Sequence, residues 1–353
     1  MKRLTKILMT TLLMLVIVVL VGKFVFDQFI ASDRAIARGI ERSYERNEEI
    51  AADLLDTDEI NIVLVGTAGP MSPTEAQTAT AVFVNGRFFL FDAGDYTQKR
   101  MEQLRLPMEA LDAVFLTHFH NDHIADLGEV MQRSYILGRE KDLVVYGPTG
   151  VDDIVTGFNM VYSMDCDHRT EHHGEEVMPS GYHFMTANEF DAELKEVVVY
   201  EKDGVVVTAF QNYHPPIEPT FGYIVEYAGK KVVISGDTLI TNELTAYSKN
   251  ADLLVMDIMN YELVTLMEES FRATGQEDLA IIMDDIREYH PDANDIGIMA
   301  QEQGVKRLAL THYAPSPKND SIMKRFYVDP VKSNYKGELI AGGDGTTITI
   351  PLE

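Results

Sequence analysis

The sequence has one cysteine, no tryptophan and few basic residues for a chain of 353 residues. Because Cys166 is the only cysteine, an internal disulfide and a zinc site built from cysteines are both excluded. Thirty Lys and Arg stand against 56 Asp and Glu, which gives a net charge of −26 at pH 7. A surface of that sign repels the phosphate backbone, so the composition argues against nucleic acid as a partner.

The N-terminus carries an apolar run without charges, from Ile7 to Gly22. Basic residues precede this run, namely Lys2, Arg3 and Lys6. This pattern is typical of a secretory signal or a signal anchor. The nearest small-x-small cleavage site, at 35–37, is far downstream, so we favour an uncleaved transmembrane anchor over a cleaved, secreted form. The basic flank predicts that the rest of the chain lies outside the cytoplasm, in a periplasmic or other extracytoplasmic compartment.

The sequence predicts three segments. Residues 1–30 form the anchor, and residues 31–57, rich in Ala, Arg and Glu, form a charged helical linker. Residues 58–353 form a single large domain, because 46% hydrophobic and 24% charged residues are ordinary for a globular protein. Without residues 1–30 the chain keeps 55 acidic and 26 basic residues, a charge of −29.

Short apolar strands alternate with turns and helices from Glu59 onward. The predicted strands are 60–65, 80–84, 88–91, 114–116, 143–146, 197–200, 205–210, 222–227, 231–234, 253–256, 308–310 and 346–350. The predicted helices are 97–104, 124–137, 241–248 and 293–303. Many strands with several hairpins and interspersed helices predict an α+β fold, with two sheets and outer helices, rather than a doubly wound parallel sheet.

The densest group of chemically active residues is Thr-His-Phe-His-Asn-Asp-His at 117–123, directly after a predicted strand. In extended backbone, residues two apart face the same way, so His118 and His120 can converge on one metal ion. Asp122 and His123 lie in the following turn and can serve a second ion. Three imidazoles so close together are costly to hold without a cation. The pattern therefore predicts a metal site.

Three later residues each follow a predicted strand: His214, Asp237 and His312. Strand ends are the places where two sheets could present ligands along one edge. Taken singly, each could instead be a core histidine or a turn aspartate. Together with the run at 117–123, they predict one shared site.

At these residues the sequence resembles the metallo-β-lactamase-fold hydrolases, in the branch that contains ribonuclease Z and the zinc-dependent arylsulfatases. The resemblance covers about residues 58–353. It rests on segments 63–67 (Val-Leu-Val-Gly-Thr), 91–94 (Phe-Asp-Ala-Gly), 117–123, 221–223 (Phe-Gly-Tyr), 235–238 (Ser-Gly-Asp-Thr), 304–308 and 311–312. It implies a four-layer αββα sandwich with a dinuclear metal site at one sheet edge.

The resemblance also implies the role of each site residue. His118, His120 and His214 look like the ligands of a first zinc ion, Asp122, His123 and His312 like those of a second, with Asp237 bridging. Nitrogen and oxygen donors suit zinc, and manganese and iron are the alternatives. Two such ions, about 3.5–4 Å apart, can share a water that acts as the nucleophile. Asp92, Thr117 and Thr238 are candidates for orienting the ligands, and Asp92 could instead cap a turn.

His290, which precedes Pro291, stands where ribonuclease Z-like enzymes carry a histidine that donates a proton to the substrate. The family partner of that histidine is a glutamate, and Asp257 occupies its place here with a side chain shorter by one methylene. The shorter side chain leaves undecided whether Asp257 contacts His290 directly, and His290 could also be a structural histidine. The resemblance implies His290, Asp122 and Asp257 as catalytic residues.

The other four histidines lie in the segment 165–183, which we interpret as an insertion beside the mouth of the site. Arg169 within it could meet an anionic group on the substrate. The alternative is a solvated polar loop. Substrate choice is expected to depend on this segment.

We therefore expect an exported dinuclear zinc hydrolase that acts on a small ester: a sulfate ester, a phosphodiester or a carboxylic ester, as in the arylsulfatase-like members. The alternatives are a ribonuclease Z-like tRNA 3′ endonuclease, a β-lactam or lactone hydrolase, and a non-catalytic binding protein. The segment 73–77 lacks the basic residues usual in ribonuclease Z, and the charge of −29 disfavours tRNA. Members of the family often dimerise, so the resemblance implies a homodimer as one alternative for the oligomeric state.

Overall fold

The computed structural model describes residues 2–30 and 32–352. Met1, Ala31 and Glu353, at which the predicted segments begin or end, lie outside the described residues. The chain divides after Ala52 into two compact units.

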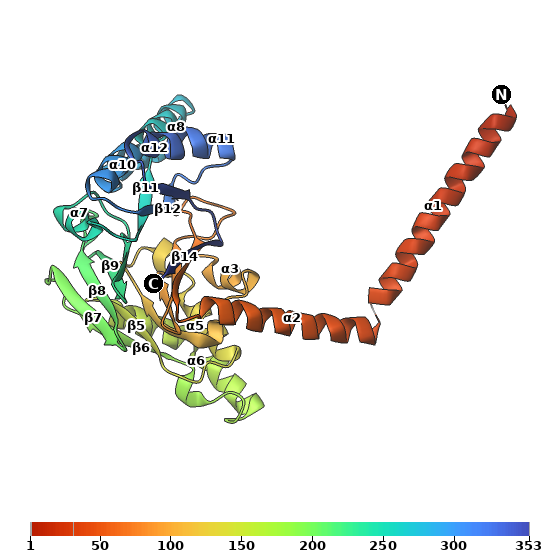
Figure 1. The fold of residues 1–353 in the computed structure, drawn as a ribbon, viewed down its shortest axis with the longest axis horizontal. Helices are drawn as coiled ribbons and strands as arrows, with labels where there is room; N and C mark the ends of the chain where they lie inside the picture. The colour runs from red at the N-terminus through yellow and green to blue at the C-terminus, as the bar shows by residue number, and fades with distance from the viewer. Residues whose placement is uncertain (1, 31, 353) are drawn as a thin grey trace. The chain divides into compact units, whose positions relative to one another are not determined.

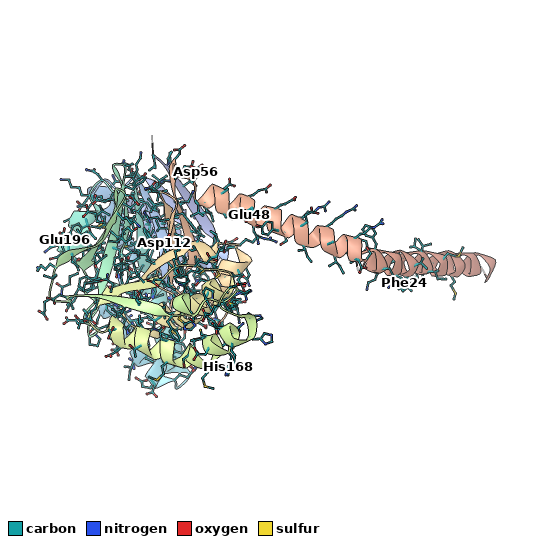
Figure 2. All side chains as sticks on the ribbon, turned by 90° about the horizontal axis from the view of Figure 1, so that it is seen from below. Phe24, Glu48, Asp56, Asp112, His168 and Glu196 are labelled. Carbon is teal, nitrogen blue, oxygen red and sulfur yellow. The ribbon has the colours of Figure 1, made fainter. Side chains whose placement is uncertain are left out.

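The first unit consists of two helices, α1 (Lys2–Ile30) and most of α2 (Asp33–Leu54). Apolar side chains described on α1 are exposed, and Phe24, labelled in Figure 2, is 63% exposed. Among the described residues no single helix has the length and hydropathy of a membrane span. The bent pair Met14–Ile30 and Asp33–Leu54, taken together, has the length and composition of one. The predicted anchor therefore stays a prediction.

The second unit contains two mixed seven-stranded sheets within the described residues (Figure 1). In the first sheet the strands are ordered β14 (Thr346–Pro351), β1 (Glu59–Gly66), β2 (Ala79–Val84), β3 (Arg87–Phe91), β4 (Leu111–Phe115), β5 (Leu143–Pro148) and β6 (Met185–Phe190). In the second they are ordered β13 (Glu338–Ala341), β12 (Arg307–Ala314), β11 (Leu253–Met259), β10 (Lys230–Ile234), β9 (Phe221–Tyr227), β8 (Val205–Gln211) and β7 (Glu196–Lys202).

Alternation along the strands builds the core between the two sheets. On β1, Ile60, Ile62 and Leu64 face the same way and are buried in a cluster that also holds Val207 and Val225 from the second sheet. The β2–β3 hairpin turns through Asn85 and Gly86, whose φ angles of 49° and 70° suit a two-residue turn. An Asn-Gly pair between two apolar runs is typical of such a turn.

Helices cover the outer faces of the sheets. The helices in chain order are α3 (Thr97–Gln103), α4 (Asn121–Ile124), α5 (Leu127–Ile136), α6 (Val151–His173), α7 (Asn242–Ser248), α8 (Tyr261–Ala273), α9 (Glu277–Asp285), α10 (Ala293–Glu302), α11 (Asp320–Ile322) and α12 (Asp329–Asn334). A second core cluster joins α7, α10 and α12 to the outer face of the second sheet (Figure 1). The α+β class and the two sheets are thus as the sequence predicted.

The segment 165–183 differs from its prediction. Its first part is the C-terminal half of α6, a helix of 23 residues, and not a loop. Arg169 pairs with Asp165 one turn earlier on the same helix, so its guanidinium is already engaged. Tyr135 on α5 and Thr170 share a hydrogen bond of 3.0 Å, which ties α6 to the fold. His168 lies on the exposed side of α6 (Figure 2).

Candidate metal centre

The run 117–123 spans the end of β4 and the start of α4. The strand ends at Phe115, and His120 occupies the N-cap position of α4, with extended backbone. Asp122 and His123 therefore lie on the first turn of α4, and both are buried. Because the chain changes from strand to helix here, His118 and His120 join one group of ligands, and Asp122 and His123 join a second group beside it.

The other predicted ligands come from the second sheet. His214 follows β8, Asp237 follows β10, and His312 lies within β12 rather than after it. His312 has a φ of 46°, a left-handed conformation that is rare outside glycine, and it interrupts the register between β11 and β12. All three side chains are buried.

These residues form two groups that meet at Asp237. In the first, ligand atoms of His118, His120, His214 and Asp237 lie within 4.8 Å of one another, and Nε2 of His118 is 3.0 Å from Nδ1 of His120. In the second, ligand atoms of Asp122, His123 and His312 lie within 4.8 Å of one another.

The carboxylate of Asp237 touches the second group directly. Its Oδ2 lies 3.1 Å from Nε2 of His312 and 3.3 Å from Nε2 of His123. The structure thus brings together all seven residues that the sequence analysis singled out as ligands.

The donor atoms fit metal ions. Nε2 of His123 and Oδ1 of Asp237 are buried and have no hydrogen-bond partner, although His123 and Asp237 are close in space. A buried polar atom without a partner costs free energy of folding. A cation bound by the lone pairs of these nitrogen and oxygen atoms removes that cost. The donor set of imidazole nitrogens and carboxylate oxygens, without sulfur, suits zinc.

The electrostatics are those of a cation site. Burial, with the charges of the neighbouring imidazoles, lowers the pKa of His118 well below its usual value, and burial lowers the pKa of His214 to about 4. Such rings are neutral at pH 7, as metal binding requires. Burial opposes ionisation of Asp122, but the charge of His123 and a hydrogen bond from His312 lower the pKa of Asp122 to about 2. The rings of His118 and His214 are therefore neutral beside an ionised Asp122. Burial opposes the charged form of His123 and His312 as well, but the charge of Asp237 outweighs it and raises the pKa of His123 well above its usual value and the pKa of His312 to about 8.

Residues that are not ligands fix the orientation of the imidazole rings through hydrogen bonds. Oδ2 of Asp92 lies 2.8 Å from Nδ1 of His123, and Oδ1 accepts from the backbone N–H of Thr117 at 2.9 Å. Oγ1 of Thr117 lies 3.0 Å from Nδ1 of His118. Asp92 thus orients a ring as well as closing a turn. Thr238 instead accepts from the backbone N–H of Tyr213 at 3.1 Å and so holds the segment before His214.

Asp92→Asn is expected to weaken metal binding by about 10- to 100-fold, the usual effect of removing a carboxylate partner of a ligating histidine. Asparagine tolerates the left-handed backbone of residue 92 (φ 59°), so the fold should persist. Competition with a chelator, followed as metal retained per protein, measures the effect. Unchanged metal affinity would show that Asp92 serves only the turn.

His290 lies beside both groups. Its Nδ1 is 3.1 Å from Oδ2 of Asp257, so the shorter acidic side chain does reach it. The ring stacks on His312 with centroids 5.2 Å apart. Burial lowers the pKa of His290 to about 4, whereas burial and the charge of Asp237 raise the pKa of Asp257 well above its usual value. Both shifts favour the uncharged forms, so the contact between Asp257 and His290 is a hydrogen bond rather than an ion pair.

A cavity of about 270 Å³ opens in front of the two groups. Its walls come from the loop after β1, from α9 and the turn after it, and from the loop after β12; they include Gly69, Pro70, Met71, Ile282, Met283, Ile286, Tyr289, Tyr313, Ala314, Pro315 and Ser316. Segment 165–183 contributes none of the described lining residues, which corrects the prediction that it lies beside the site mouth.

The sequence analysis assigned no element to residues 261–288, which form α8, α9 and a short 3-10 turn (Ile286–Glu288). One signal was present: the side chain of Asn260 accepts from the backbone N–H of Leu263 as an N-cap, and an apolar stripe follows on α8. This pair of helices, here called the α8–α9 hairpin, takes the place beside the cavity that segment 165–183 was expected to fill.

The sequence is similar to those of known proteins. A model of the beta-lactamase superfamily domain matches residues 87–313. Ribonuclease Z of Mycobacterium sp. (strain KMS) is 31% identical over 259 residues, covering 72% of this chain and 85% of that protein. Ribonuclease Z of Mycobacterium marinum is 30% identical over 261 residues, covering 73% and 87%.

Solved structures share the fold at lower identity. The short form of human tRNase Z is 21% identical, with a TM-score of 0.58 over 82% of this chain and 99% of that one. A metallo-beta-lactamase fold protein from Bacillus subtilis is 20% identical, with a TM-score of 0.60 over 83% and 100%.

The relatives correct the predicted partners. The expectations that nucleic acid is not a partner, and that the substrate is a small anionic or ester compound, are wrong, because the curated relatives are ribonucleases. Net charge is a sum over the whole surface, whereas bond cleavage depends on groups at one place. The relatives favour the ribonuclease Z-like alternative over the arylsulfatase-like interpretation.

Proposed function

The chain belongs to the beta-lactamase superfamily and is a metal-dependent hydrolase, and from this premise we propose that it cleaves phosphodiester bonds in RNA, as a ribonuclease Z-like enzyme. One observation carries the proposal: Asp237 contacts His123 and His312 of one ligand group and lies within 4.8 Å of the ligand atoms of the other, and His290 lines the same cavity. A phosphodiester needs both features, since its charge must be neutralised and its leaving oxygen must be protonated.

The seven ligands divide between two metal sites. His118, His120 and His214 would hold one ion, Asp122, His123 and His312 the other, and Asp237 would serve both. Zinc fits this donor set best. When bound, the pair would supply an activated water and neutralise the charge that develops on the phosphodiester.

His290 would protonate the leaving oxygen. A bond to Asp257 fixes one nitrogen of the ring, and the ring itself lines the cavity. Asp257 is held in turn: Oγ of Ser235 lies 3.3 Å from its Oδ1 and accepts its backbone N–H at 3.1 Å. Asp257 thus positions the ring. Both side chains are buried, so water does not compete for the contact between them.

A panel of substrates tests which bond is cleaved. We expect the purified full-length protein to hydrolyse bis(p-nitrophenyl) phosphate and RNA, and chelation followed by zinc addition to remove and restore both activities. p-Nitrophenyl sulfate, a carboxylic ester, a lactone and a β-lactam are the comparison substrates. Preference for any of these over the phosphodiesters, compared as kcat/KM, would overturn the proposal.

We also propose that residues 1–30 anchor the chain in a membrane, with the catalytic unit outside the cytoplasm. The uncharged run 7–22 behind a basic flank supports this topology. A reporter fused after residue 40 tests it: alkaline phosphatase should be active and β-galactosidase inactive. The reverse result would place the catalytic unit in the cytosol, where precursor tRNA is present.

A further inference from the structure

We infer that the cavity in front of the metal centre binds the nucleobase next to the scissile phosphodiester, with Tyr289 as its stacking surface. This inference rests on the proposed function and names a recognition element for it. The observations that carry it are the position of Tyr289, the chemistry of the cavity walls and the way in which the α8–α9 hairpin is held.

Tyr289 is built into the site through its backbone. Its carbonyl oxygen accepts a hydrogen bond from Nδ1 of His214 at 3.1 Å, which fixes that ligand. Its ring packs edge-on against His214, with centroids 4.7 Å apart, and at a tilt against His290, with centroids 5.0 Å apart. The ring also lines the cavity, where its surface stands beside the reacting groups.

The α8–α9 hairpin holds Tyr289 in this place. The hydroxyl of Tyr261, at the start of α8, donates to the carbonyls of Arg287 and His290, both at 2.9 Å. The Arg287 guanidinium pairs with Glu268 on α8 at 2.6 Å. The backbone on both sides of Tyr289 is thus tied to α8. A ring held in this way loses little entropy when a ligand stacks on it.

The walls of the cavity are apolar where they meet solvent. Met71 and Ile282 both line it and are 50% and 46% exposed. None of the described lining residues is Lys or Arg. Exposed apolar residues at a cavity mouth indicate a binding surface, and aromatic walls with apolar neighbours are how proteins bind unpaired bases.

The size of the cavity limits what enters. At about 270 Å³ it is slightly smaller than the pockets of roughly 300–1,000 Å³ that hold drug-sized ligands. That space suits one base with its sugar and not a folded RNA. Without basic residues in the lining, affinity has to come from the base and from the metal site, and not from many phosphate contacts.

Two small substrates separate these contributions. Thymidine 5′-(p-nitrophenyl phosphate) carries a base, and methyl p-nitrophenyl phosphate does not, while both have the same leaving group. We expect Tyr289→Ala to raise KM for the thymidine substrate by about 5- to 150-fold, the range of base stacking on an aromatic ring, and to raise KM for the methyl substrate far less, so that the ratio of the two KM values reports stacking. Tyr289→Phe should keep the wild-type KM, since stacking needs only the ring.

Controls separate recognition from folding. Tyr182→Ala, at a tyrosine outside the cavity lining, should change neither substrate, and metal content should stay at the wild-type value in Tyr289→Ala because the carbonyl that holds His214 remains. KM for the thymidine substrate should change by less than about threefold between 50 and 200 mM salt, as expected for a single phosphate contact.

The inference can fail separately from the proposed function. Equal KM values for both substrates, unaffected by Tyr289→Ala, would overturn base recognition while phosphodiester cleavage stands. If neither substrate is cleaved, the proposed function fails, and calorimetric binding of thymidine 5′-monophosphate decides the inference. Binding that weakens in Tyr289→Ala and persists in Tyr289→Phe supports it, and binding that is absent or equal in both variants overturns it.

Discussion

Asp237→Asn is expected to lower kcat/KM for bis(p-nitrophenyl) phosphate by more than about 10³-fold, beyond the loss of a single electrostatic donor. The reason is its position: Oδ2 contacts His123 and His312, and the carboxylate also completes the group of His118, His120 and His214. An amide of the same shape keeps the packing but removes the negative charge that two cations would share. Metal content should fall below about two equivalents per chain.

A matched aspartate is the control for this variant. Asp329 is exposed, pairs with Lys324 and is not among the described residues that line the cavity, so Asp329→Asn should keep metal content and kcat/KM near the wild-type values. Atomic absorption on dialysed samples and steady-state kinetics give both quantities. An Asp237→Asn protein with two bound metals and near wild-type turnover would contradict the shared carboxylate.

His290→Ala is expected to lower kcat for RNA by about 10²- to 10⁴-fold, the usual contribution of a general acid. The leaving oxygen of a ribose is a poor leaving group without a proton, whereas p-nitrophenolate is a stable anion. The same variant should therefore lose much less activity on bis(p-nitrophenyl) phosphate. The ratio of the two losses reports proton donation rather than a general disturbance of the site.

The metal content of His290→Ala distinguishes a proton donor from a ligand. A nitrogen of His290 lies within 4.8 Å of ligand atoms of Asp237 and His312, so coordination by His290 is a geometric alternative. We expect the variant to keep the wild-type metal content. Loss of a metal ion would assign His290 to the ligands. Asp257→Asn should reproduce part of the kinetic defect, because it leaves the ring in place without the carboxylate that positions it.

The ligands of the metal site were more predictable than the walls of the cavity, because four of them lie in one short segment of the sequence. The run 117–123 places its four predicted ligands through the geometry of one strand end and one helical turn, and the spacing of these residues in the sequence reflects that geometry. The remaining ligands could be related to it because Asp237 and His214 follow strands of a second sheet. The left-handed backbone of His312 inside β12 has no signal of this kind.

The walls of the cavity were not predictable, because they depend on tertiary packing. Residues 261–288 carry helical signals, but their position beside the cavity follows from contacts such as those of Tyr261 and Arg287. Segment 165–183 looked like a loop because polar side chains dominate it, and those side chains cover the solvent side of α6. The charge of −26 misled the choice of partner, since a sum over the surface does not describe one cavity.

Metal titration of RNA cleavage tests the central claim most directly, that two metal sites joined by Asp237 cleave a phosphodiester. The metal-free protein, supplied with increasing zinc, is incubated with an end-labelled RNA, and the initial rate is measured against equivalents of metal per chain. The account predicts no cleavage without metal and a plateau at about two equivalents. A plateau at one equivalent, or cleavage that persists in the presence of a chelator, would contradict it.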